Sequence, residues 1–230
     1  MFKQLALDLQ LRETYTLDNF ITGDNALVIE LLRQAVAADG EQQLYLWGDV
    51  FTGKSHLLQA LCQLAIERQL TISYLPFKQL IDYSPEVLEG LEVIDLICID
   101  DVQMVAGRAD WQLRVFDLIN RIRESGKQLV FAADLPPNEL NIQLEDLRSR
   151  LNWGPVLRLQ GLDDQDKQRA LQLRASLRGF ELSEQTANFI LKNYARDLAG
   201  LFDRLEQLDK VSLAEQRRLT IPFVKSVFES

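Results

Sequence analysis

The chain has 230 residues, of which 47% are hydrophobic and 26% charged, and its 34 acidic and 25 basic residues give a formal net charge of −9. This is the composition of a globular protein with a sizeable core, and the acidic balance argues against stand-alone binding to duplex DNA, which needs a basic footprint. No apolar run approaches the roughly 18 residues of a membrane span, and the first residues lack the apolar stretch of a signal peptide. Because Cys62 and Cys98 occupy apolar positions, we expect buried thiols in a soluble, cytoplasmic protein.

Apolar runs typical of strands alternate with helical patterns in the first two thirds of the chain. We expect strands at residues 44–47, 71–75, 94–99, 128–132 and 156–159, and helices at 54–69, 111–125 and 139–149. Strands that alternate with helices form parallel βαβ units, so the pattern predicts an α/β fold with a five-stranded parallel sheet covered on both faces. Residues 1–13 precede this pattern and are expected to form a flexible arm.

After Gly161 the pattern is helical. We expect helices at residues 163–177, 183–194, 197–208 and 221–228. Ser183 is expected to cap the second of these, because a serine oxygen can accept a backbone N–H of the first turn. The sequence therefore predicts an α/β domain over residues 14–160, followed by a small all-helical domain over residues 161–230.

Residues 48–55 read GDVFTGKS, a complete P-loop between an expected strand and an expected helix. Gly48 and Gly53 permit backbone turns in which successive N–H groups point at phosphate oxygens. Lys54 supplies a mobile positive charge for the β- and γ-phosphates, and the Ser55 hydroxyl can ligate Mg²⁺. The helix that follows directs the positive end of its dipole to the same anion. This motif predicts nucleotide binding.

The second half of a nucleotide site is indicated by Asp100 and Asp101, which end the apolar run 96–99. Asp100 is expected to hold Mg²⁺ opposite Ser55, usually through water. Asp101 stands where a base or water-orienting carboxylate is needed, and many related enzymes have Glu there, so hydrolysis by the chain alone is left open. Asp134 ends the next strand, where a polar side chain can sense the γ-phosphate, although the turn into two prolines explains an aspartate equally well.

Two arginines stand at helix ends. Arg150 closes the helix expected at 139–149, and Arg196 opens a helix of the second domain. Most surface arginines are solvated or paired with carboxylates, and the sequence alone does not exclude that role here. An arginine at the γ-phosphate of a neighbouring subunit raises the hydrolysis rate by about 10³–10⁵.

Together these motifs resemble the AAA+ ATPases, and more closely the replication initiator family DnaA. The similar segments are 15–25 (its adenine pocket), 99–103 (Walker B), 134–137 (sensor 1), 149–154 (Box VII, which holds the arginine finger) and 196–200 (sensor 2). The resemblance spans roughly residues 14–210 and implies an AAA+ P-loop NTPase fold whose helical domain is a lid. It also implies that Ser55 and Asp100 bind Mg²⁺ and that Asp101 takes part in catalysis, and we assign no chemical step to His56. The residues implied to bind ADP or ATP are Asp18, Asn19, Phe20, Asn25, Gly48, Thr52, Gly53, Lys54, Ser55, His56, Asp134 and Arg196.

The N-terminal arm contains Gln4-Leu5-Ala6-Leu7-Asp8-Leu9. A glutamine followed by spaced leucines is similar to the short peptides that insert into the groove of the sliding clamp, the beta subunit of DNA polymerase. Gln4 would satisfy polar groups at the rim of the groove while Leu5, Leu7 and Leu9 fill it, as suits an arm that orders on contact. Packing of these leucines on the core is the alternative.

This arm, joined to a DnaA-like core without the basic DNA-binding domain of DnaA, resembles the regulatory inactivators of DnaA, the Hda family. Segments 177–182 and 217–225 strengthen the likeness. The resemblance implies a negative regulator of chromosomal replication initiation that binds the DNA-loaded clamp and presents Arg150 in trans to the ATP of DnaA. Its own nucleotide would act as a conformational lock, and its finger face could also join two copies in a homodimer.

Other functions stay open. A helicase-loader-type ATPase shares the DnaA-like core, but it would line a groove with basic and aromatic residues, and the net charge of −9 argues against this. A free-standing nucleotide kinase would need an acceptor pocket and a lid rich in arginine. A scaffold with an inactive site is disfavoured by Lys54, Ser55 and Asp100.

Overall fold

The computed structural model describes residues 15–37, 40–194, 197–215 and 217–228 of the chain. Their contacts divide the molecule into two units. The first contains the described residues up to Phe20 together with Asn25–Leu159, and the second contains Ile21–Asp24 and the described residues from Gln160 onward. Among the described residues, no helix is both long enough and apolar enough to cross a bilayer.

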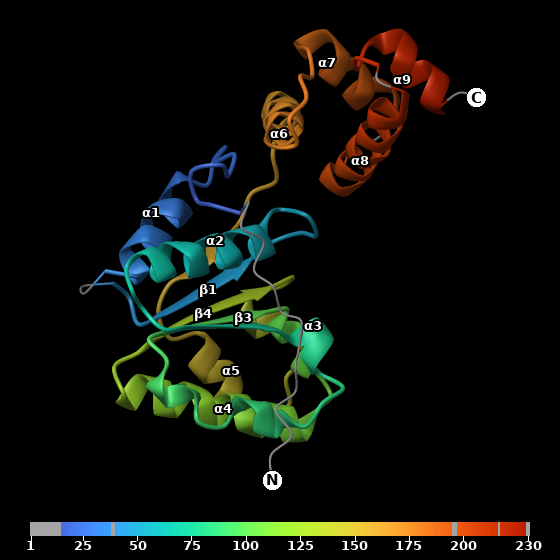
Figure 1. The fold of residues 1–230 in the computed structure, drawn as a ribbon. Coiled ribbons are helices and arrows are strands. Elements are labelled where there is room, and N and C mark those ends of the chain that lie inside the picture. The colour runs from blue at the N-terminus through green and yellow to red at the C-terminus, as the bar shows by residue number, and fades with distance from the viewer. Residues whose placement is uncertain (1–14, 38–39, 195–196, 216, 229–230) are drawn as a thin grey trace. The chain divides into compact units, whose positions relative to one another are not determined.

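The first unit is built on a sheet of five parallel strands, which confirms the predicted sheet (Figure 1). The strands are β1 (Gln43–Trp47), β2 (Ile72–Pro76), β3 (Leu96–Asp100), β4 (Gln128–Ala133) and β5 (Val156–Arg158), in the spatial order β2-β3-β4-β1-β5. Because all neighbouring strands are parallel, their carboxyl ends meet at one edge of the sheet. That edge carries the P-loop after β1 and the two aspartates at the end of β3.

Helices cover both faces of this sheet, as Figure 1 shows. They are α1 (Ala26–Ala35), α2 (Lys54–Glu67), α3 (Phe77–Leu80), α4 (Ala109–Glu124) and α5 (Glu145–Leu151). Leu44 and Leu46 of β1 belong to the core under α1 and α2, whereas Tyr45 belongs to the core under α3, α4 and α5. This alternation follows from the two-residue period of a strand. Cys62 and Cys98 are buried and free in the first of these cores, as expected.

The helix expected at residues 139–149 begins only at Glu145, so its predicted start is wrong. A 3₁₀ turn at Pro137–Glu139 precedes it, and the buried side chain of Gln112 holds the intervening loop. Gln112 Oε1 accepts two backbone N–H groups of this loop at 3.1 and 3.0 Å. These bonds pair backbone N–H groups that a longer helix would have paired internally. Their acceptor, the Gln112 side chain, lies on another helix, α4. Helices α1 and α3 are additional to the predicted elements.

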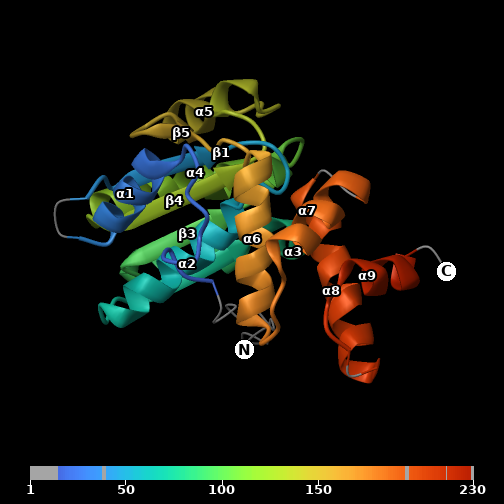
Figure 2. The ribbon, with the colours of Figure 1, turned by 90° about the horizontal axis from the view of Figure 1, so that it is seen from above.

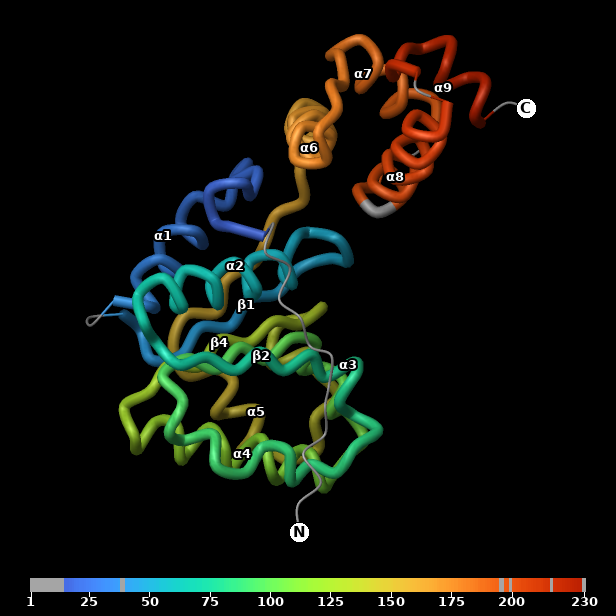
Figure 3. Tube along the Cα trace, in the orientation of Figure 1, coloured from blue at the N-terminus to red at the C-terminus, as the bar shows by residue number. Residues whose placement is uncertain are grey.

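The second unit is all-helical in its described residues, as predicted (Figure 2). It has its own hydrophobic core. It contains α6 (Asp164–Leu177), α7 (Glu184–Asn193), α8 (Leu198–Glu215) and α9 (Ile221–Phe228), which can be followed along the tube in Figure 3. Ser183 caps α7 as predicted, because its hydroxyl oxygen accepts the N–H of Thr186. Helix α8 extends past the expected end at residue 208, since Val211 continues its apolar side onto the core.

Candidate functional site

The loop at residues 48–53 lies between β1 and α2, at the carboxyl edge of the sheet. Gly53 is the N-cap of α2 with a φ of 95°, and Phe51 has a φ of 67°, so left-handed residues alternate with others along the loop. Such alternation turns backbone N–H groups to one side and forms a concavity for an anion. The N-terminus of α2 adds the positive end of its dipole. The backbone therefore has the shape of a phosphate-binding loop.

Packing also requires the two glycines of this loop. A Cβ on Gly48 would lie 2.7 Å from the carbonyl oxygen of Leu159, and a Cβ on Gly53 would lie 2.6 Å from the Phe20 ring. Both distances are shorter than a Cβ contact allows. The loop can approach the end of β5 and the segment before α1 only because these positions lack a side chain.

The ammonium group of Lys54 is buried at the start of α2. Its Nζ donates to the carbonyl oxygens of Gly48 at 2.7 Å and Asp49 at 2.9 Å, and it lies 3.4 Å from Asp134 Oδ1. These partners compensate the burial of the charge. The structure thus brings the P-loop lysine to the residue predicted to sense the γ-phosphate. Thr52 braces the same loop, because its hydroxyl donates to the Asp49 carbonyl at 3.0 Å.

Asp100 is buried at the carboxyl end of β3. Its Oδ2 accepts a hydrogen bond from the Tyr74 hydroxyl at 2.8 Å, and its Oδ1 accepts one from the backbone N–H of Asp101 at 3.1 Å. Burial raises the pKa of the Asp100 carboxyl, and the neighbouring hydroxyls of Ser55 and Tyr74 oppose this shift. The two residues predicted to hold Mg²⁺ are therefore neighbours at this edge of the sheet.

A hydroxyl and a carboxylate are hard oxygen ligands, so Ser55 and Asp100 fit Mg²⁺. This ion takes one or two protein carboxylates and completes its shell with phosphate oxygens and water. In the described part of the chain, no three His, Cys, Asp or Glu side chains gather into a metal cluster.

Gln103 joins two acidic residues at the same edge. Its Nε2 donates to Asp101 Oδ1 at 2.9 Å and to Asp134 Oδ2 at 3.1 Å. The backbone of Asp101 is left-handed, with φ 57° and ψ 44°. With the contact between Lys54 and Asp134, these bonds form one polar chain from the P-loop to the second aspartate after β3.

Sequence reasoning did not assign Tyr74 or Gln103 to the site. Tyr74 lies on β2 in a run without a motif, and nothing in its neighbours pointed to Asp100. Gln103 follows Asp101 by two positions inside the segment that resembles Walker B, and this place was the available signal. The strand order β2-β3-β4 brings both side chains to the aspartates.

The segment expected in an adenine pocket is fixed to the first turn of α2 through His56. The Nε2 of His56 lies 3.0 Å from the carbonyl oxygen of Thr16, and its ring stacks on Tyr15 with 4.4 Å between centroids. The edge of the Phe20 ring contacts the same imidazole, with 5.5 Å between centroids. Asn19 and Thr16 exchange side-chain to backbone hydrogen bonds at 3.1 and 3.2 Å. His56 therefore positions this segment beside the P-loop.

Two further predicted nucleotide ligands lie beside α1. Asp18 is exposed, and its Oδ1 accepts a hydrogen bond from Arg33 of α1 at 2.6 Å. Asn25 is buried at the N-cap of α1. The predicted sensor 2 residue and clamp-binding residues lie outside the described residues; these are Arg196, Gln4, Leu5, Leu7 and Leu9.

Arg150 lies in the last turn of α5, and three neighbours fix its guanidinium group. The guanidinium lies over the Trp153 ring at 3.8 Å from the centroid and at 5.6 Å from the Phe116 centroid. Its Nε donates to Asn120 Oδ1 at 3.0 Å. The Nη1 and Nη2 groups have no hydrogen-bond or ion-pair partner within the described residues. The side chain is held in place with its outer donors available.

The main chain of this turn is tied to the amino end of β1. Gln43 Nε2 donates to the carbonyl oxygens of Arg150 at 2.8 Å and Trp153 at 3.1 Å. The P-loop follows Trp47, so the anchoring point is about 13 Å from it along the strand, at about 3.3 Å per residue. Arg150 is therefore anchored at the edge of the sheet opposite to the P-loop of its own chain.

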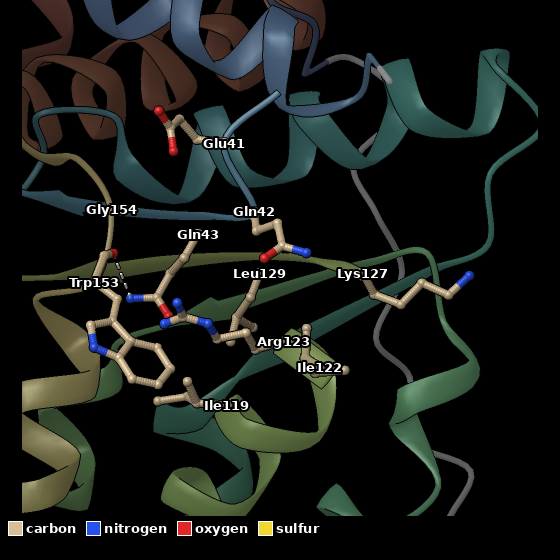
Figure 4. A pocket seen from close by; sticks show the side chains of 10 residues that line it. All are labelled: Glu41, Gln42, Gln43, Ile119, Ile122, Arg123, Lys127, Leu129, Trp153 and Gly154. Atoms are coloured by element: carbon tan, nitrogen blue, oxygen red, sulfur yellow. Dashed lines mark hydrogen bonds between the residues drawn. The ribbon is translucent and has the colours of Figure 1, made fainter. Parts of the chain in front are cut away.

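A cavity of about 140 Å³ opens beside Trp153 at this opposite edge (Figure 4). Its lining residues are Glu41, Gln42, Gln43, Ile119, Ile122, Arg123, Lys127, Leu129, Trp153 and Gly154. The Arg123 guanidinium also lies over the Trp153 ring, at 3.8 Å from the centroid. Two guanidinium groups thus share one indole. We refer to Arg123, Arg150 and Trp153 as the arginine face.

Comparison with known proteins identifies two matching families. The family described as bacterial DnaA ATPase domain matches residues 11–158, and the one described as Hda, lid domain, matches residues 164–228. Domain III of the Thermotoga maritima replication initiation protein DnaA shares the fold, with a TM-score of 0.83 and 24% identity over 96% of this chain and 98% of that chain.

Two nucleotide-bound structures are also similar. A replication initiator DnaA bound to AMPPCP and single-stranded DNA has a TM-score of 0.74 and 25% identity, over 90% of this chain and 69% of that chain. AMPPCP-bound DnaA from Aquifex aeolicus has a TM-score of 0.72 and 25% identity, over 89% and 68%. The two family matches follow one another along the sequence, so the chain belongs to the Hda/DnaA-like family of AAA+ proteins, with a DnaA-type ATPase domain and an Hda-type lid.

Proposed function

We propose that this chain is a nucleotide-binding regulator of DnaA that supplies Arg150 in trans to the ATP of DnaA and thereby stimulates its hydrolysis. It would act as a negative regulator of chromosomal replication initiation, because DnaA that has hydrolysed its ATP no longer opens the origin. The observation that carries the proposal is the way in which Arg150 is held. The side chain is fixed on Trp153 and Asn120, keeps its outer donors available, and is anchored away from its own P-loop.

The chemistry of the guanidinium suits this role. An arginine carries five N–H donors in a planar fork that matches phosphate oxygens, and Arg150 uses one of them on Asn120. Because stacking restricts its rotamers before any partner docks, Arg150 would lose less of the about 0.5–1.5 kcal/mol of entropy that ordering a side chain costs. An arginine in this position would stabilise the negative charge that develops on the γ-phosphate of DnaA.

In its own P-loop the chain would bind ADP or ATP with Mg²⁺. Lys54 would turn from the loop carbonyls to the phosphates, and Ser55 and Asp100 would hold the ion, which neutralises phosphate charge. The two similar DnaA structures that contain AMPPCP support a nucleotide in a fold of this kind. We infer that this nucleotide serves as a conformational lock, and that the chain is an activator of DnaA rather than an efficient ATPase.

The proposed partners are DnaA and the sliding clamp. The clamp would be bound by Gln4, Leu5, Leu7 and Leu9, an expectation that rests on the sequence. The net charge of −9 supports a protein that reaches DNA through another protein. Association of two copies through the arginine face would compete with DnaA for the same surface.

The test is phosphate release from ATP-loaded DnaA in the presence of DNA-loaded clamp. We expect strong stimulation by the wild-type chain and almost none by Arg150→Ala, given the factor of about 10³–10⁵ that such an arginine contributes. Arg148→Ala is the matched control, because this arginine lies on the same helix and pairs with Glu145 at 3.6 Å. Equal activity of the Arg150→Ala chain, together with ATP turnover by the chain alone, would instead support the alternative of a helicase-loader-type ATPase.

A further inference from the structure

Arg123 is the arginine of α4 whose charge is not paired within the described residues. The other two arginines of this helix, Arg114 and Arg121, lie 3.4 and 2.6 Å from carboxylate oxygens of the same chain. The side chain of Arg123 makes neither a hydrogen bond nor an ion pair with any described residue, and its guanidinium group lies over the Trp153 ring. Its hydrogen-bond donors are therefore available to a ligand.

A second guanidinium group lies on the same ring. Arg123 and Arg150 are each 3.8 Å from the Trp153 centroid, so the two groups can be no farther apart than twice this distance. Arg150 donates to the neutral amide of Asn120, and no carboxylate pairs with either arginine among the described residues. Like charges this close repel. In a chain with a net charge of −9, two adjacent unpaired cations form a local positive patch that an anionic partner would neutralise.

Arg123 and Trp153 also line the cavity at this edge of the sheet (Figure 4). Ile122 and Leu129 contribute apolar walls, whereas Arg150 is not among the lining residues, so a phosphate bound by Arg150 would leave this space open. The volume of about 140 Å³ is below the roughly 300–1,000 Å³ of small-molecule sites and suits a single side chain. Apolar walls beside a guanidinium group fit a side chain with a methylene stem and a carboxylate head.

Two other charged residues line this cavity, and neither neutralises Arg123. Lys127 is paired, because its Nζ lies 2.7 Å from Asp95 Oδ1. Glu41 is exposed and forms no ion pair within the described part of the chain, and Figure 4 shows its carboxylate apart from the Arg123 guanidinium. Arg123 is therefore the lining cation that can bind an incoming carboxylate.

We propose that Arg123 binds an aspartate or glutamate side chain of DnaA, next to the contact of Arg150 with the γ-phosphate, and that it sets the affinity for DnaA rather than the rate of hydrolysis. The planar fork of a guanidinium group matches both oxygens of a carboxylate, and stacking on Trp153 orients it before the partner docks. The inference rests on the proposed function, since it names the chemical group of the partner that docks beside Arg150.

The test is phosphate release from ATP-loaded DnaA with DNA-loaded clamp, at increasing concentrations of the full chain. Arg123→Gln removes the charge, and we expect the concentration that gives half-maximal stimulation to rise at least about tenfold, the factor that a hydrogen bond between charged groups provides. The maximal rate should stay within about twofold of wild type, because a binding contact outside the reacting atoms does not change it. Arg150→Ala, in contrast, should lower the maximal rate. Disturbed packing around Trp153 would also lower the maximal rate, so the two parameters separate a lost contact from a lost structure.

Arg114→Gln is the matched control, because Arg114 lies on the same helix and pairs with Glu89 of its own chain. We expect it to leave the half-maximal concentration unchanged. Arg123→Lys retains the charge and should recover part of the affinity, whereas Arg123→Glu should bind more weakly than Arg123→Gln, since it would place like charges opposite one another. Added salt should weaken binding of the wild type more than that of Arg123→Gln.

The inference is overturned if wild type and Arg123→Gln reach half-maximal stimulation at the same concentration, or if the loss appears in the maximal rate alone. If Arg123→Gln alters self-association of the chain in sedimentation experiments and leaves the affinity for DnaA unchanged, the cavity would belong to a contact with a second copy, which also overturns the inference.

Direct binding to fluorescently labelled, AMPPCP-loaded DnaA gives the affinity without hydrolysis, so the two proposals can fail separately. Weaker binding by Arg123→Gln, together with equal stimulation of DnaA by wild type and Arg150→Ala, would retain this inference and overturn the arginine finger. Equal binding by wild type and Arg123→Gln, together with loss of stimulation in Arg150→Ala, would do the reverse.

Discussion

The guanidinium group of Arg150 lies 3.8 Å from the centre of the Trp153 ring, while its backbone carbonyl accepts a hydrogen bond from Gln43 at the start of β1. The ring fixes the side chain, and the sheet fixes the main chain. An arginine held in this way loses little freedom when it meets a phosphate. Substitution of the residues that hold Arg150 therefore tests its role, as substitution of Arg150 itself does.

Asn120→Ala should reduce the stimulation of DnaA by about tenfold or more, because a hydrogen bond to a charged group contributes about 1.5 kcal/mol or more, and 1.4 kcal/mol is a factor of ten. The measurement is phosphate release from ATP-loaded DnaA, with unfolding monitored in parallel. Asn152→Ala is the control, because the Asn152 side chain bonds to Asn138 and to the backbone carbonyl of Arg148 and makes no hydrogen bond with the Arg150 side chain. An equal loss in both variants would contradict the positioning of Arg150 by Asn120.

Gly48→Ala should lower the free energy of unfolding by about 1–3 kcal/mol, the usual cost of overpacking. The added Cβ would meet the backbone oxygen of Leu159 at 2.7 Å, so the loop or β5 must move. Gly161→Ala is the control, because its Cβ would meet nothing within 4 Å. We expect that variant to change stability by no more than about 0.5 kcal/mol. Urea denaturation distinguishes the two, and similar curves would refute the close approach.

Tyr74→Phe should weaken nucleotide binding that depends on Mg²⁺. Burial already raises the pKa of Asp100, and the lost hydroxyl would raise it further, so less of the carboxylate would be ionised near neutral pH. The defect should therefore shrink as the pH is raised, which a Mg²⁺ titration of fluorescent-nucleotide binding at several pH values would reveal. Tyr83→Phe, which alters an exposed tyrosine, is the control. A defect that is independent of pH would point to altered packing instead.

Because of Asp95, the free energy of unfolding of the first unit should vary with pH in the acid range. Hydrogen bonds from Lys127 at 2.7 Å and from the hydroxyl and backbone N–H of Thr71 hold the pKa of its carboxyl below the ordinary value. Because the folded pKa lies below the unfolded value of about 4, the ionised group stabilises the fold above that pH, and this contribution is lost as the pH falls toward the folded pKa.

Asp95→Asn should therefore cost about 1–2 kcal/mol at neutral pH, from the weakened hydrogen bonds, and the difference from wild type should narrow below about pH 4. Urea denaturation at a series of pH values measures it. Asp203→Asn, an exposed aspartate without an ion pair among the described residues, should show no such trend. A difference from wild type that is constant with pH would exclude ionisation of Asp95 as its cause.

Much of the nucleotide site could be predicted from neighbouring residues in the sequence. A strand followed by GDVFTGKS predicts the P-loop, and an apolar strand that ends in two acids predicts their place at the same edge of a parallel sheet. The structure accordingly brings Ser55 to Asp100. The start of the helix expected at 139–149 was wrong because the side chain of Gln112, on another helix, holds the loop before it.

By itself, the sequence determined the five-stranded parallel sheet, the P-loop and the helical second unit, because each depends on residues that are adjacent or repeat with the period of a strand or a helix. Only the tertiary structure decided the partners of the functional side chains. Tyr74 and Asp100 are separated by 26 residues, Gln103 and Asp134 by 31, and Gln43 and Arg150 by 107. These contacts depend on which strands are neighbours and on how the helices pack against them, and local spacing does not specify either.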